Sequence, residues 1–571
     1  MSYTKPWKVL DKYRGAFFDG HWPTLPEMFR ITVERFGERS CWTIFDPGKI
    51  SLTFNEALEK IERIAQWLRE AGIQKGDKIA VTGKNSPEWI VAYMAALFAG
   101  AIIVPIDVQL KQEEVNLLIK TADVRMIFTD DEKIDYFNDN LGSDNNPIEH
   151  IISLTAGKGT YLYDLEAQTP YSIPQPNEDD TAAILFTSGT TGRPKGVMLS
   201  HKNLITDGFA AVAVPFNVSE TDVFYAILPL QHAYTAIIVI VAMIFGSEVV
   251  FGKRLVVKQI FRDLKEGHVN IMLAVPMLYN KVLAGIMKGL KEKGLLVYGL
   301  IRALMALSGL IRRLSGKNPG KKLFGFILDK VSFRNIRVCI SGGGSLAASV
   351  SKTYNAMGVP FVQGYGLTET SPIITLNPEE HYKEGSVGRV LPMCEMKIIN
   401  ADSNGIGEVV VRGSMVMQGY YKMPEETAAV FTEDGWLKTG DIGYIDNENY
   451  LYLTGRAKNI IVTSGGKNVY PEEIENEFQL YEKIEQILVR PFIYDETIKD
   501  ERIEALIYPA MDYFVNTDKA EIQKVMEEIV NEVNTRLLPY QRIDRVILLE
   551  KSMEMTSTKK IKRNSVQGTT Y

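Results

Sequence analysis

The stretch from Thr187 to Gly196, TSGTTGRPKG, combines hydroxyls, glycines and one lysine in a pattern suited to a polyphosphate. Glycines let backbone N–H groups approach phosphate oxygens, and Ser and Thr hydroxyls donate to those oxygens or ligate a magnesium ion. Lys195 adds the compensating positive charge. The residues of this stretch that we predict to bind a nucleotide are Thr187, Ser188, Gly189, Thr190, Thr191, Gly192 and Lys195.

This stretch is not a Walker A loop. Counting from Gly189, Pro194 stands where the second glycine belongs, and Gly196 replaces the Ser or Thr after the lysine. Apolar residues at 181–186 and at 196–200 predict a short strand on each side. The loop is therefore expected between two strands rather than at a helix N-terminus. The alternative is an ordinary surface hairpin rich in Gly and Thr.

Two acidic residues further along the chain complement this loop. GYGLTET at 364–370 places Glu369, a hard oxygen ligand suited to Mg²⁺, between two threonines. GWLKTGD at 435–441 places Asp441 after a turn, where a carboxylate can accept hydrogen bonds from two ribose hydroxyls. Taken singly, each motif is also compatible with an ordinary turn.

The surrounding pattern predicts a layered α/β fold. An amphipathic helix at 54–70, a strand at 78–82, a helix at 89–98 and a strand at 101–106 alternate, which indicates parallel strands with helices between them. A second such series runs through 180–360. We therefore expect a large N-terminal body of layered α/β subdomains.

The composition changes after residue 390. Residues 396–400, a turn at 402–405 and residues 408–412 predict a β-hairpin, and further strands are expected at 450–454 and 460–463. A β-rich subdomain should follow the α/β body. Beyond Pro471 the alternation of helix and strand predicts a small α+β C-terminal domain.

The whole-chain composition excludes several classes of protein. The 571 residues are 46% apolar and 23% charged, as in soluble globular proteins, and the net charge of −6 argues against a nucleic-acid partner. The three cysteines are far apart, which suits a reducing, cytoplasmic location. We expect no signal peptide, and the longest apolar run, 236–245, has about half of the ~20 residues of a spanning helix.

Seven motifs occur together and in a specific order along nearly the whole chain. In this set the sequence resembles the adenylate-forming superfamily, and it is most similar to its long-chain fatty-acyl-CoA synthetases. The motifs are TSGTTGRPKG at 187–196, PLQHAYT at 229–235, SGGGSLA at 341–347, GYGLTET at 364–370, GWLKTGD at 435–441, GRAKNIIVTSGGKNVYPEEIE at 455–475 and TSTKKIKR at 556–563.

The resemblance implies a reaction in two steps within one site. A carboxylate attacks the α-phosphate of ATP and yields acyl-AMP and pyrophosphate, after which the thiol of coenzyme A displaces AMP. ATP, Mg²⁺ and coenzyme A are the implied cofactors and co-substrates. Catalysis of such a step depends on positioning and on cationic stabilisation rather than on a protein nucleophile.

The resemblance also implies a role for each motif residue. Thr187 and Glu369 would hold Mg²⁺, and Thr368 would contact the α-phosphate. Asp441 and Arg456 would bind the ribose. The residues implied to frame the adenine are Gly343, Gln363, Gly364 and Tyr365.

Two further side chains are implied to act at the reacting groups. His232 would lie between the acyl carboxylate and the nucleotide, with a core histidine as the alternative. Lys560 matches the lysine of the adenylation step by position, although Lys559 stands where the family has glycine. A solvated basic tail is the alternative for Lys560.

The resemblance implies three parts of the chain that move relative to one another. These are a large domain over 1–455, whose β-rich subdomain covers about 380–455, a hinge at 456–458 around Lys458, and a small domain over 459–571. Rotation of the small domain would withdraw Lys560 after the first step. The residues implied to line the thiol tunnel in the second step are Gly465, Gly466 and Lys467.

A segment at 288–330 carries ten basic residues and only two acidic ones. Its middle, 294–314, is a largely apolar helix with basic flanks, and similar insertions mark the long-chain members of the family. Such a helix suits peripheral contact with an anionic membrane, at the inner face of a cellular membrane. A helix packed on the protein with a solvated basic face is the open alternative, and an oligomer is also compatible with the sequence.

The acid substrate is predicted from residues 228–245, which contain no Asp or Glu. An amino-acid substrate would need a carboxylate there, whereas the apolar wall at 236–244 suits a hydrocarbon. Three functions remain open: a long-chain fatty acid:CoA ligase, an acyl-ACP synthetase or fatty acyl-AMP ligase, and an inactive, membrane-associated acyl-binding scaffold. The first is the leading prediction, and the presence of all the motif residues argues against the inactive scaffold.

Overall fold

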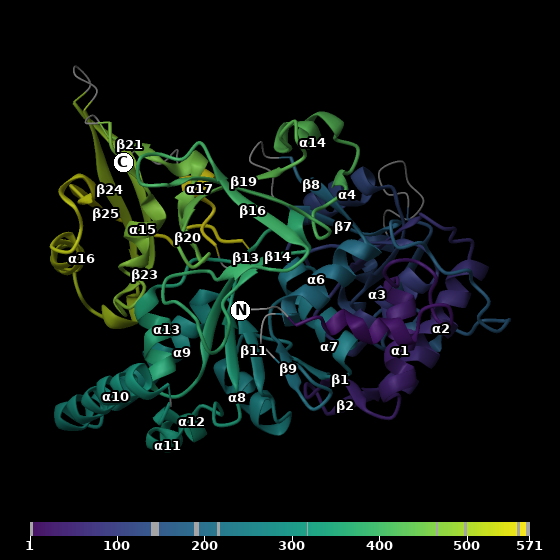
Figure 1. Cartoon of the computed structure of the whole chain (residues 1–571). Helices are drawn as coiled ribbons and strands as arrows, with labels where there is room; N and C mark the ends of the chain where they lie inside the picture. The colour runs from purple at the N-terminus through teal and green to yellow at the C-terminus, as the bar shows by residue number, and fades with distance from the viewer. Residues whose placement is uncertain are drawn as a thin grey trace.

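The structure is a computed structural model that describes residues 4–138, 148–187, 193–213, 217–316, 318–463, 466–495, 500–556 and 560–566. Figure 1 shows two large sheets with helices between and around them, and a separate group of C-terminal elements, in yellow, at one edge. The predicted α/β class is confirmed. The five nucleotide-loop residues 188–192, and Gly465 and Lys317, lie outside the described residues.

The nucleotide-loop strands belong to a seven-stranded sheet. Its inner strands are parallel, as the alternating pattern predicted, while β8 and β18 add antiparallel pairs at one edge. The strand order is β18 (Gly419–Tyr420), β8 (Lys195–Ser200), β7 (Thr181–Thr187), β4 (Ile102–Pro105), β3 (Lys78–Thr82), β5 (Val124–Thr129) and β6 (His150–Ser153).

A nine-stranded sheet carries the remaining strands of the α/β body. Its central strands are parallel to one another. The order is β15 (Arg389–Val390), β14 (Ile373–Leu376), β13 (Phe361–Gly366), β12 (Val338–Ser341), β11 (Ile271–Ala274), β9 (Val223–Ala226), β10 (Glu248–Phe251), β1 (Ser40–Ile44) and β2 (Ile50–Thr53).

Helices and sheets alternate in five layers. Strand residues point to opposite faces in turn, so that Phe224 and Ala226 of β9 join one core and Tyr225 the other. The helices between the sheets are α1 (Leu25–Phe36), α2 (Phe54–Glu70), α3 (Pro87–Phe98), α6 (His201–Ala213) and α7 (Ala233–Phe245). The outer helices are α4 (Gln112–Ala122), α5 (Ile134–Asn138), α8 (Val257–Glu266), α9 (Pro276–Lys291) and α13 (Ala348–Ala356).

All three cysteines are reduced and buried in this body. Cys41 lies on β1, Cys339 on β12 and Cys394 at the start of the following sheet. Burial raises the pKa of each thiol, to about 12 for Cys339 and Cys394. The thiolate form of each is therefore scarce at neutral pH.

A four-stranded antiparallel sheet follows, as the change in composition predicted. The predicted hairpin is present, with Ile399 opposite Glu408 and a turn closed by a hydrogen bond from Gly405 N–H to the Asp402 carbonyl. The strand order is β16 (Cys394–Ile399), β17 (Gly407–Gly413), β19 (Leu437–Ile445) and β20 (Leu451–Arg456), and α14 (Pro424–Val430) precedes β19.

The C-terminal elements form a smaller layer with its own hydrophobic core. Phe478, Met526 and Val533 are buried between one helix and a three-stranded sheet. The elements are β21 (Ile461–Val462), β22 (Asn468–Val469), α15 (Pro471–Asn476), β23 (Ile484–Asp495), β24 (Asp500–Pro509), α16 (Lys519–Asn534), β25 (Arg545–Leu548) and α17 (Arg563–Val566).

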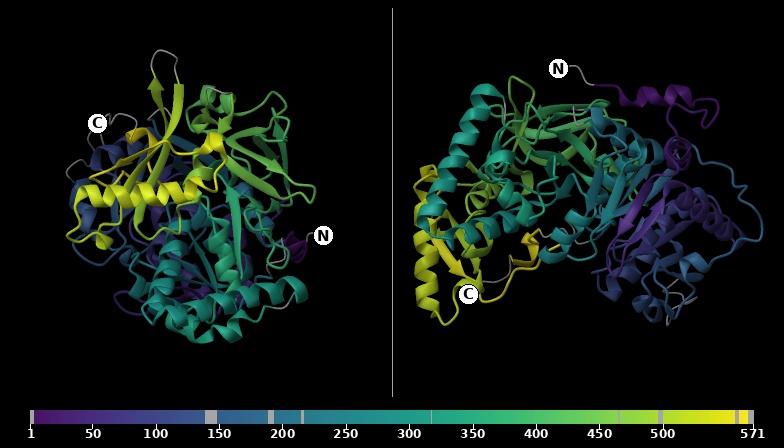
Figure 2. Two further views of the ribbon diagram at one scale, coloured as in Figure 1. Left: turned by 90° about the vertical axis from the view of Figure 1, so that its left-hand side faces the viewer. Right: turned by 90° about the horizontal axis from the view of Figure 1, so that it is seen from below.

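The basic insertion forms α10 (Leu295–Ser315), followed by α11 (Gly320–Leu323) and α12 (Gly325–Lys330). The predicted helix over 294–314 is thus confirmed. In Figure 2, α10 lies along the outside of the molecule, on the side of the C-terminal elements. By length and composition, α10 is the one helix among the described residues that could span a membrane, and only 17% of its most apolar window is buried.

Candidate active site

The nucleotide-loop strands meet in antiparallel register at Thr187 and Lys195. The Thr187 hydroxyl donates to the Lys195 carbonyl at 3.5 Å. The loop therefore connects two strands, as predicted, and its two ends are held side by side. Its central residues, 188–192, lie outside the described part of the chain.

Tyr420 joins two of the predicted side chains. Its hydroxyl donates to Glu369 Oε1 at 2.9 Å, and the Lys195 ammonium lies 4.8 Å from the centre of its ring. Burial and the Glu369 charge raise the pKa of Tyr420, so it remains a donor at neutral pH. Strand β18 places Tyr420 because it pairs directly with β8. Lys195 and Glu369 thus share one tyrosine as a common contact.

Glu369 lies in a 3-10 turn, Thr368–Thr370, which also contains the predicted α-phosphate contact Thr368. The backbone of this turn is fixed because Met417 N–H donates to the Glu369 carbonyl at 2.9 Å. One carboxylate, braced by a tyrosine hydroxyl, fits Mg²⁺, which keeps several waters and takes further ligands from phosphate. Glu369, together with the Thr187 hydroxyl, is a donor set of the right chemistry for this ion.

Asp441, Arg456 and Tyr365 form a second cluster. The Tyr365 hydroxyl donates to Asp441 Oδ2 at 2.7 Å, and Arg456 Nε lies 2.7 Å from Asp441 Oδ1. Antiparallel pairing of β19 with β20 sets Asp441 opposite Arg456. Burial acts to lower the pKa of Arg456, but Asp441 and Tyr365 more than offset this, and the pKa is raised. The Asp441 carboxylate is thus held in place by one tyrosine hydroxyl and one guanidinium.

The predicted adenine residues lie on adjacent strand ends. Gln363 of β13 pairs with Ser341 of β12. Gly343, two residues after Ser341, has a positive φ of 77°. That conformation favours glycine and turns the chain across the ends of the strands. Gly364 continues β13 toward Tyr365. These residues share the edge at which the Asp441 cluster lies.

Lys560 approaches this edge from the C-terminal elements. A short turn holds its backbone, with Thr556 N–H donating to the Lys560 carbonyl at 2.8 Å and Lys560 N–H donating to the Thr556 hydroxyl at 3.1 Å. Its Cε lies 4.0 Å from the position that a β-carbon would take on Gly344. The side chain therefore reaches the predicted adenine loop from another layer of the molecule.

The electrostatics place Lys560 and His232 in one site. The surrounding protein and the Arg456 charge lower the pKa of Lys560, while Asp441 opposes the shift. Burial lowers the pKa of His232, with a further contribution from the Lys560 charge and opposition from Asp107. His232 is therefore neutral at neutral pH, at the first turn of α7.

The predicted hinge residue Lys458 lies beside the Asp441 cluster, whereas the predicted tunnel residues Gly466 and Lys467 lie in a separate turn. Lys458 is in a 3-10 turn directly after Arg456, and burial and the Arg456 charge lower its pKa. Gly466 and Lys467 are exposed in a turn between β21 and β22. Among the described residues, the hydrogen bonds of this turn join Lys467 only to Thr463. The structure does not bring Lys467 to the site.

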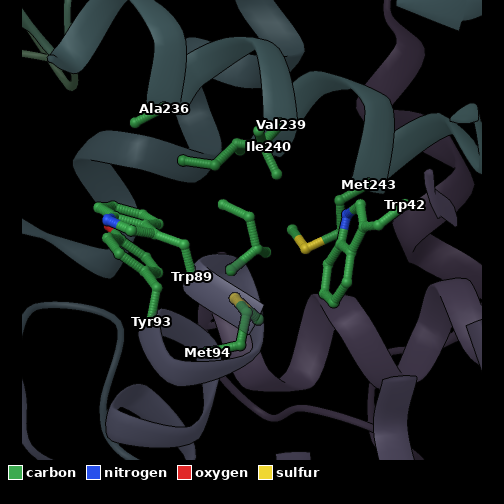
Figure 3. Close-up of a pocket in the computed structure, with 9 residues that line it drawn as sticks. Trp42, Trp89, Tyr93, Met94, Ala236, Val239, Ile240 and Met243 are labelled. Atoms are coloured by element: carbon green, nitrogen blue, oxygen red, sulfur yellow. The ribbon is translucent and has the colours of Figure 1, made fainter. Parts of the chain in front are cut away.

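An apolar slot extends along α7 from the His232 end (Figure 3). One face of α7 and one face of α3 form its walls. Trp89 and Tyr93 stack with centroids 5.7 Å apart near Ala236, and Trp42 and Met243 lie at the opposite end. The lining residues are Trp42, Trp89, Ile90, Tyr93, Met94, Ala236, Val239, Ile240 and Met243. The predicted hydrocarbon wall at 236–244 contributes four of them.

Several residues at this site were not predicted from the sequence. Tyr420 lies in a two-residue strand, and Trp89 and Tyr93 form part of an ordinary apolar helix. No pattern of residue types marks any of the three. Their contacts arise only when segments distant in the sequence pack together, so a single sequence offers no signal for them.

The fold and these clusters define an adenylate-forming enzyme. The sequence pattern of the AMP-binding enzyme family matches residues 29–421, which is more than half of the chain. The chain belongs to this family. The matched range includes the nucleotide loop, Glu369 and the slot, whereas Asp441, Arg456 and Lys560 lie beyond its end.

Known proteins similar to this chain include two ligases and a solved structure. The Arabidopsis thaliana chloroplastic long-chain-fatty-acid–[acyl-carrier-protein] ligase AEE15 is 28% identical, with 96% of this chain and 86% of that protein covered. The Mycobacterium bovis long-chain-fatty-acid–CoA ligase FadD15 is 30% identical, with 77% and 76% covered. ATP-bound MatB from Rhodopseudomonas palustris is 24% identical, with a TM-score of 0.76 and 95% and 98% covered.

Proposed function

We propose that this protein is an AMP-forming long-chain fatty acid:CoA ligase. It would activate a fatty acid with ATP to acyl-AMP, releasing pyrophosphate, and then transfer the acyl group to coenzyme A. The observation that carries the proposal is helix α7, which begins directly after His232 and lines the apolar slot from Ala236 onward. Similarity to FadD15 of Mycobacterium bovis supports a long-chain acid.

The first step is attack by the fatty acid carboxylate on the α-phosphate. Asp441 holds the ribose, and its contacts with Arg456 and Tyr365 keep the Asp441 carboxylate oriented. Lys195 and the hydroxyls of the nucleotide loop take the β- and γ-phosphates. Mg²⁺ held by Glu369 and Thr187 would neutralise charge on the phosphates. The protein thus contributes positioning and charge rather than a nucleophile.

Lys560 and His232 act where charge redistributes during that attack. The Lys560 ammonium stabilises negative charge on the carboxylate and the α-phosphate, with Thr368 as a further donor. Neutral His232 separates the nucleotide from the acyl chain without adding a second positive charge beside Lys560. Once the adenylate forms, the acyl chain lies toward α7 and pyrophosphate leaves past the nucleotide loop.

The second step requires a different position of the small domain, 459–571. Lys560 reaches Gly344, whereas the hydrogen bonds of Lys467 among the described residues go to Thr463. The short segment 456–458 around Lys458 links the two parts. Rotation about this hinge would bring Gly465, Gly466 and Lys467 to the site as Lys560 leaves, and would open a path for the thiol. The contact of Lys560 with Gly344 supports a docked small domain in the first step.

Formation of acyl-CoA is the direct test of this function. Purified protein with palmitate, ATP, Mg²⁺ and coenzyme A should produce AMP and palmitoyl-CoA, with each product dependent on palmitate. Production with holo acyl carrier protein but not with coenzyme A would assign the acyl-ACP function of the Arabidopsis relative instead. Binding of palmitate without any AMP formation would identify an inactive acyl-binding scaffold.

We also propose that α10 holds the protein at the inner face of a membrane, in the cytoplasm. Exposed leucines spaced 3, 4 or 7 residues apart form one stripe, with exposures of 91% at Leu296, 61% at Leu300 and 78% at Leu314; Leu307 and Leu310 also belong to it. Ile301 and Met305 attach the opposite face to the body. The positive excess of the insertion favours an anionic membrane over a second copy of the same charge.

The structure changes which residues should test this contact. Arg312 donates to the Tyr382 hydroxyl at 2.6 Å and lies over its ring, and Lys321 donates to the Ile336 carbonyl at 2.6 Å. Both side chains therefore contact the rest of the protein, so they do not suit a test of membrane contact by the basic segment 288–330. Arg302 and Arg313 are exposed and replace them.

Vesicle binding measures the contribution of the stripe. The triple variant L296S/L300S/L307S should lose roughly 10-fold or more of its affinity for phosphatidylglycerol vesicles, because apolar area no longer enters the membrane interface. L255S, at an exposed leucine elsewhere, is the control. Unchanged vesicle binding would contradict the membrane contact, and a dimer that the triple variant dissociates would identify a second copy as the occupant.

A further inference from the structure

The side chain of Gln479 crosses from the C-terminal elements to the loop that follows Gly344. Its Oε1 accepts a hydrogen bond from Ala347 N–H at 2.8 Å, and its Nε2 donates to the Ser345 carbonyl at 3.1 Å. One amide therefore binds the backbone of a three-residue segment through both its acceptor and its donor. A side chain of another chemistry, or an amide turned around, cannot make this pair.

Two asparagines brace the Gln479 amide from opposite sides. Asn476, one helical turn earlier, accepts from Gln479 Nε2 at 2.7 Å and from the Ser345 hydroxyl at 2.9 Å. Asn280 of α9 donates to Gln479 Oε1 at 3.4 Å. Asn476 thus orients the amide from its own domain, and Asn280 contacts it from the large domain. We call this set, Asn476 and Gln479 with Ser345–Ala347, the clasp.

The contacts around the clasp are weaker and less specific. Lys291 lies 3.6 Å from Glu482, and the Lys288 ammonium lies 5.5 Å from the centre of the Tyr513 ring. These lysines are exposed, and exposed ion pairs and cation–π contacts contribute little. The clasp is therefore the specific part of this contact surface.

The clasp and Lys560 act on neighbouring residues of one loop. Lys560 reaches Gly344, and Gln479 binds Ser345 and Ala347, so the two contact points are separated by roughly 10 Å at most. Both side chains come from the C-terminal elements, and both meet the predicted adenine loop. A shift of the small domain that breaks the clasp must also displace Lys560.

We propose that Gln479 and Asn476 are positioning residues for the adenylation step. They hold the small domain in the orientation that brings Lys560 to the nucleotide, and they must release for thiol transfer. This inference rests on the proposed ligase function and adds the device that sets the domain orientation. The clasp should therefore affect the first half-reaction and not the second.

The two half-reactions of a Q479M variant test the clasp. Methionine keeps the length of the side chain but removes both backbone hydrogen bonds. Palmitate-dependent pyrophosphate release should fall roughly 10-fold, as expected for the loss of two or three neutral hydrogen bonds. Palmitoyl-CoA formation from supplied palmitoyl-AMP should not change. Q479E, which accepts from Ala347 N–H but cannot donate to the Ser345 carbonyl, should be intermediate.

A control and a double variant separate positioning from stability. Within the described part of the chain, the Gln523 amide bonds to Glu527 and Val546, which belong to its own domain, so Q523M should leave both half-reactions unchanged. Because Gln479 acts through Lys560, Q479M should cause no further loss of adenylation in a K560A background. Additive losses, equal losses in both half-reactions, or a normal Q479M enzyme would overturn the clasp. An inactive wild-type protein would overturn the ligase function itself.

Discussion

Asp441 and Lys560 enter the same site from different domains and are held there in different ways. Asp441 lies on an inner strand of a sheet, where strand register brings Arg456 opposite it and Tyr365 donates to it. Lys560 lies on a turn of a few residues whose hydrogen bonds join it to Thr556. One side chain is fixed by its own domain, and the other by how two domains meet.

This difference separates two kinds of contribution to catalysis. Asp441 keeps its partners whatever the small domain does, so it should serve every step in which AMP is bound. With the proposed rotation of the small domain about 456–458, Lys560 would leave the site after adenylation, so it should serve one step. Residues that contact the same nucleotide can therefore differ in which half-reaction depends on them.

Replacement of Lys560 gives the largest expected effect. K560A should lower pyrophosphate release by roughly 10²- to 10³-fold, because one preorganised cation is lost from the site of charge development. Thioester formation from supplied palmitoyl-AMP should persist. K562A, two residues away, is the control for general loss of basic charge. Equal losses in the two half-reactions would remove the distinction between Lys560 and Asp441.

Replacement of Asp441 should affect both half-reactions. D441N removes a charge that binds ribose and leaves Arg456 without its ion-pair partner, which predicts losses of roughly 10- to 10²-fold in kcat/KM for ATP and for palmitoyl-AMP. D434N, at an exposed aspartate before the same strand, is the control. If D441N impaired only pyrophosphate release, Asp441 would behave as Lys560 does.

The slot extends the comparison to the acyl end of the site. A236F places a ring at the near end of the slot, so kcat/KM for palmitate should fall about 10-fold relative to octanoate, because overpacking blocks the longer chain. M243L, a volume-conserving change at the far end, is the control. Because the slot belongs to the large domain, the same preference for the shorter chain should appear when thioester formation from palmitoyl-AMP is compared with that from octanoyl-AMP. An unaltered ratio would place the chain elsewhere.

The rates of adenylation and of thioester formation should respond differently to high pH, with a difference of a few-fold. The pKa of Lys560 is lowered, mainly by burial and by Arg456, so the ammonium loses its proton at a pH below the usual value of ~10.4. The rate of adenylation should therefore decline as the pH rises through the lowered pKa of Lys560. The rate of thioester formation from palmitoyl-AMP should not show this decline. K560R should move the decline to higher pH in a kcat/KM profile.

The sequence predicts those parts of this protein that depend on local pattern. The helix over Phe54–Glu70, the strand over Lys78–Thr82 and the hairpin with Ile399 opposite Glu408 all follow from periodicity and turn residues. The clusters around Asp441 and Glu369 follow from motifs whose order resembles a known family. These features need only short stretches of chain to specify them.

The contacts that join distant segments could not be predicted in this way. Tyr420 is 51 residues from Glu369 in the sequence, and Gln479 is 132 residues from Ala347. Each pairing depends on how whole layers pack, and neither residue type marks its role. The same reason explains why the contact of Arg312, in the basic segment 288–330, with Tyr382 was not predicted.

The burial of Cys41, Cys339 and Cys394 has a practical consequence for following the domain motion. Thiol-reactive dyes need an accessible thiolate, which none of these three positions offers in the folded protein. A cysteine introduced on an exposed part of each domain would therefore be labelled selectively without removing the native ones. Energy transfer between two such dyes would report the domain orientation during turnover, in the wild-type background and in variants of the clasp.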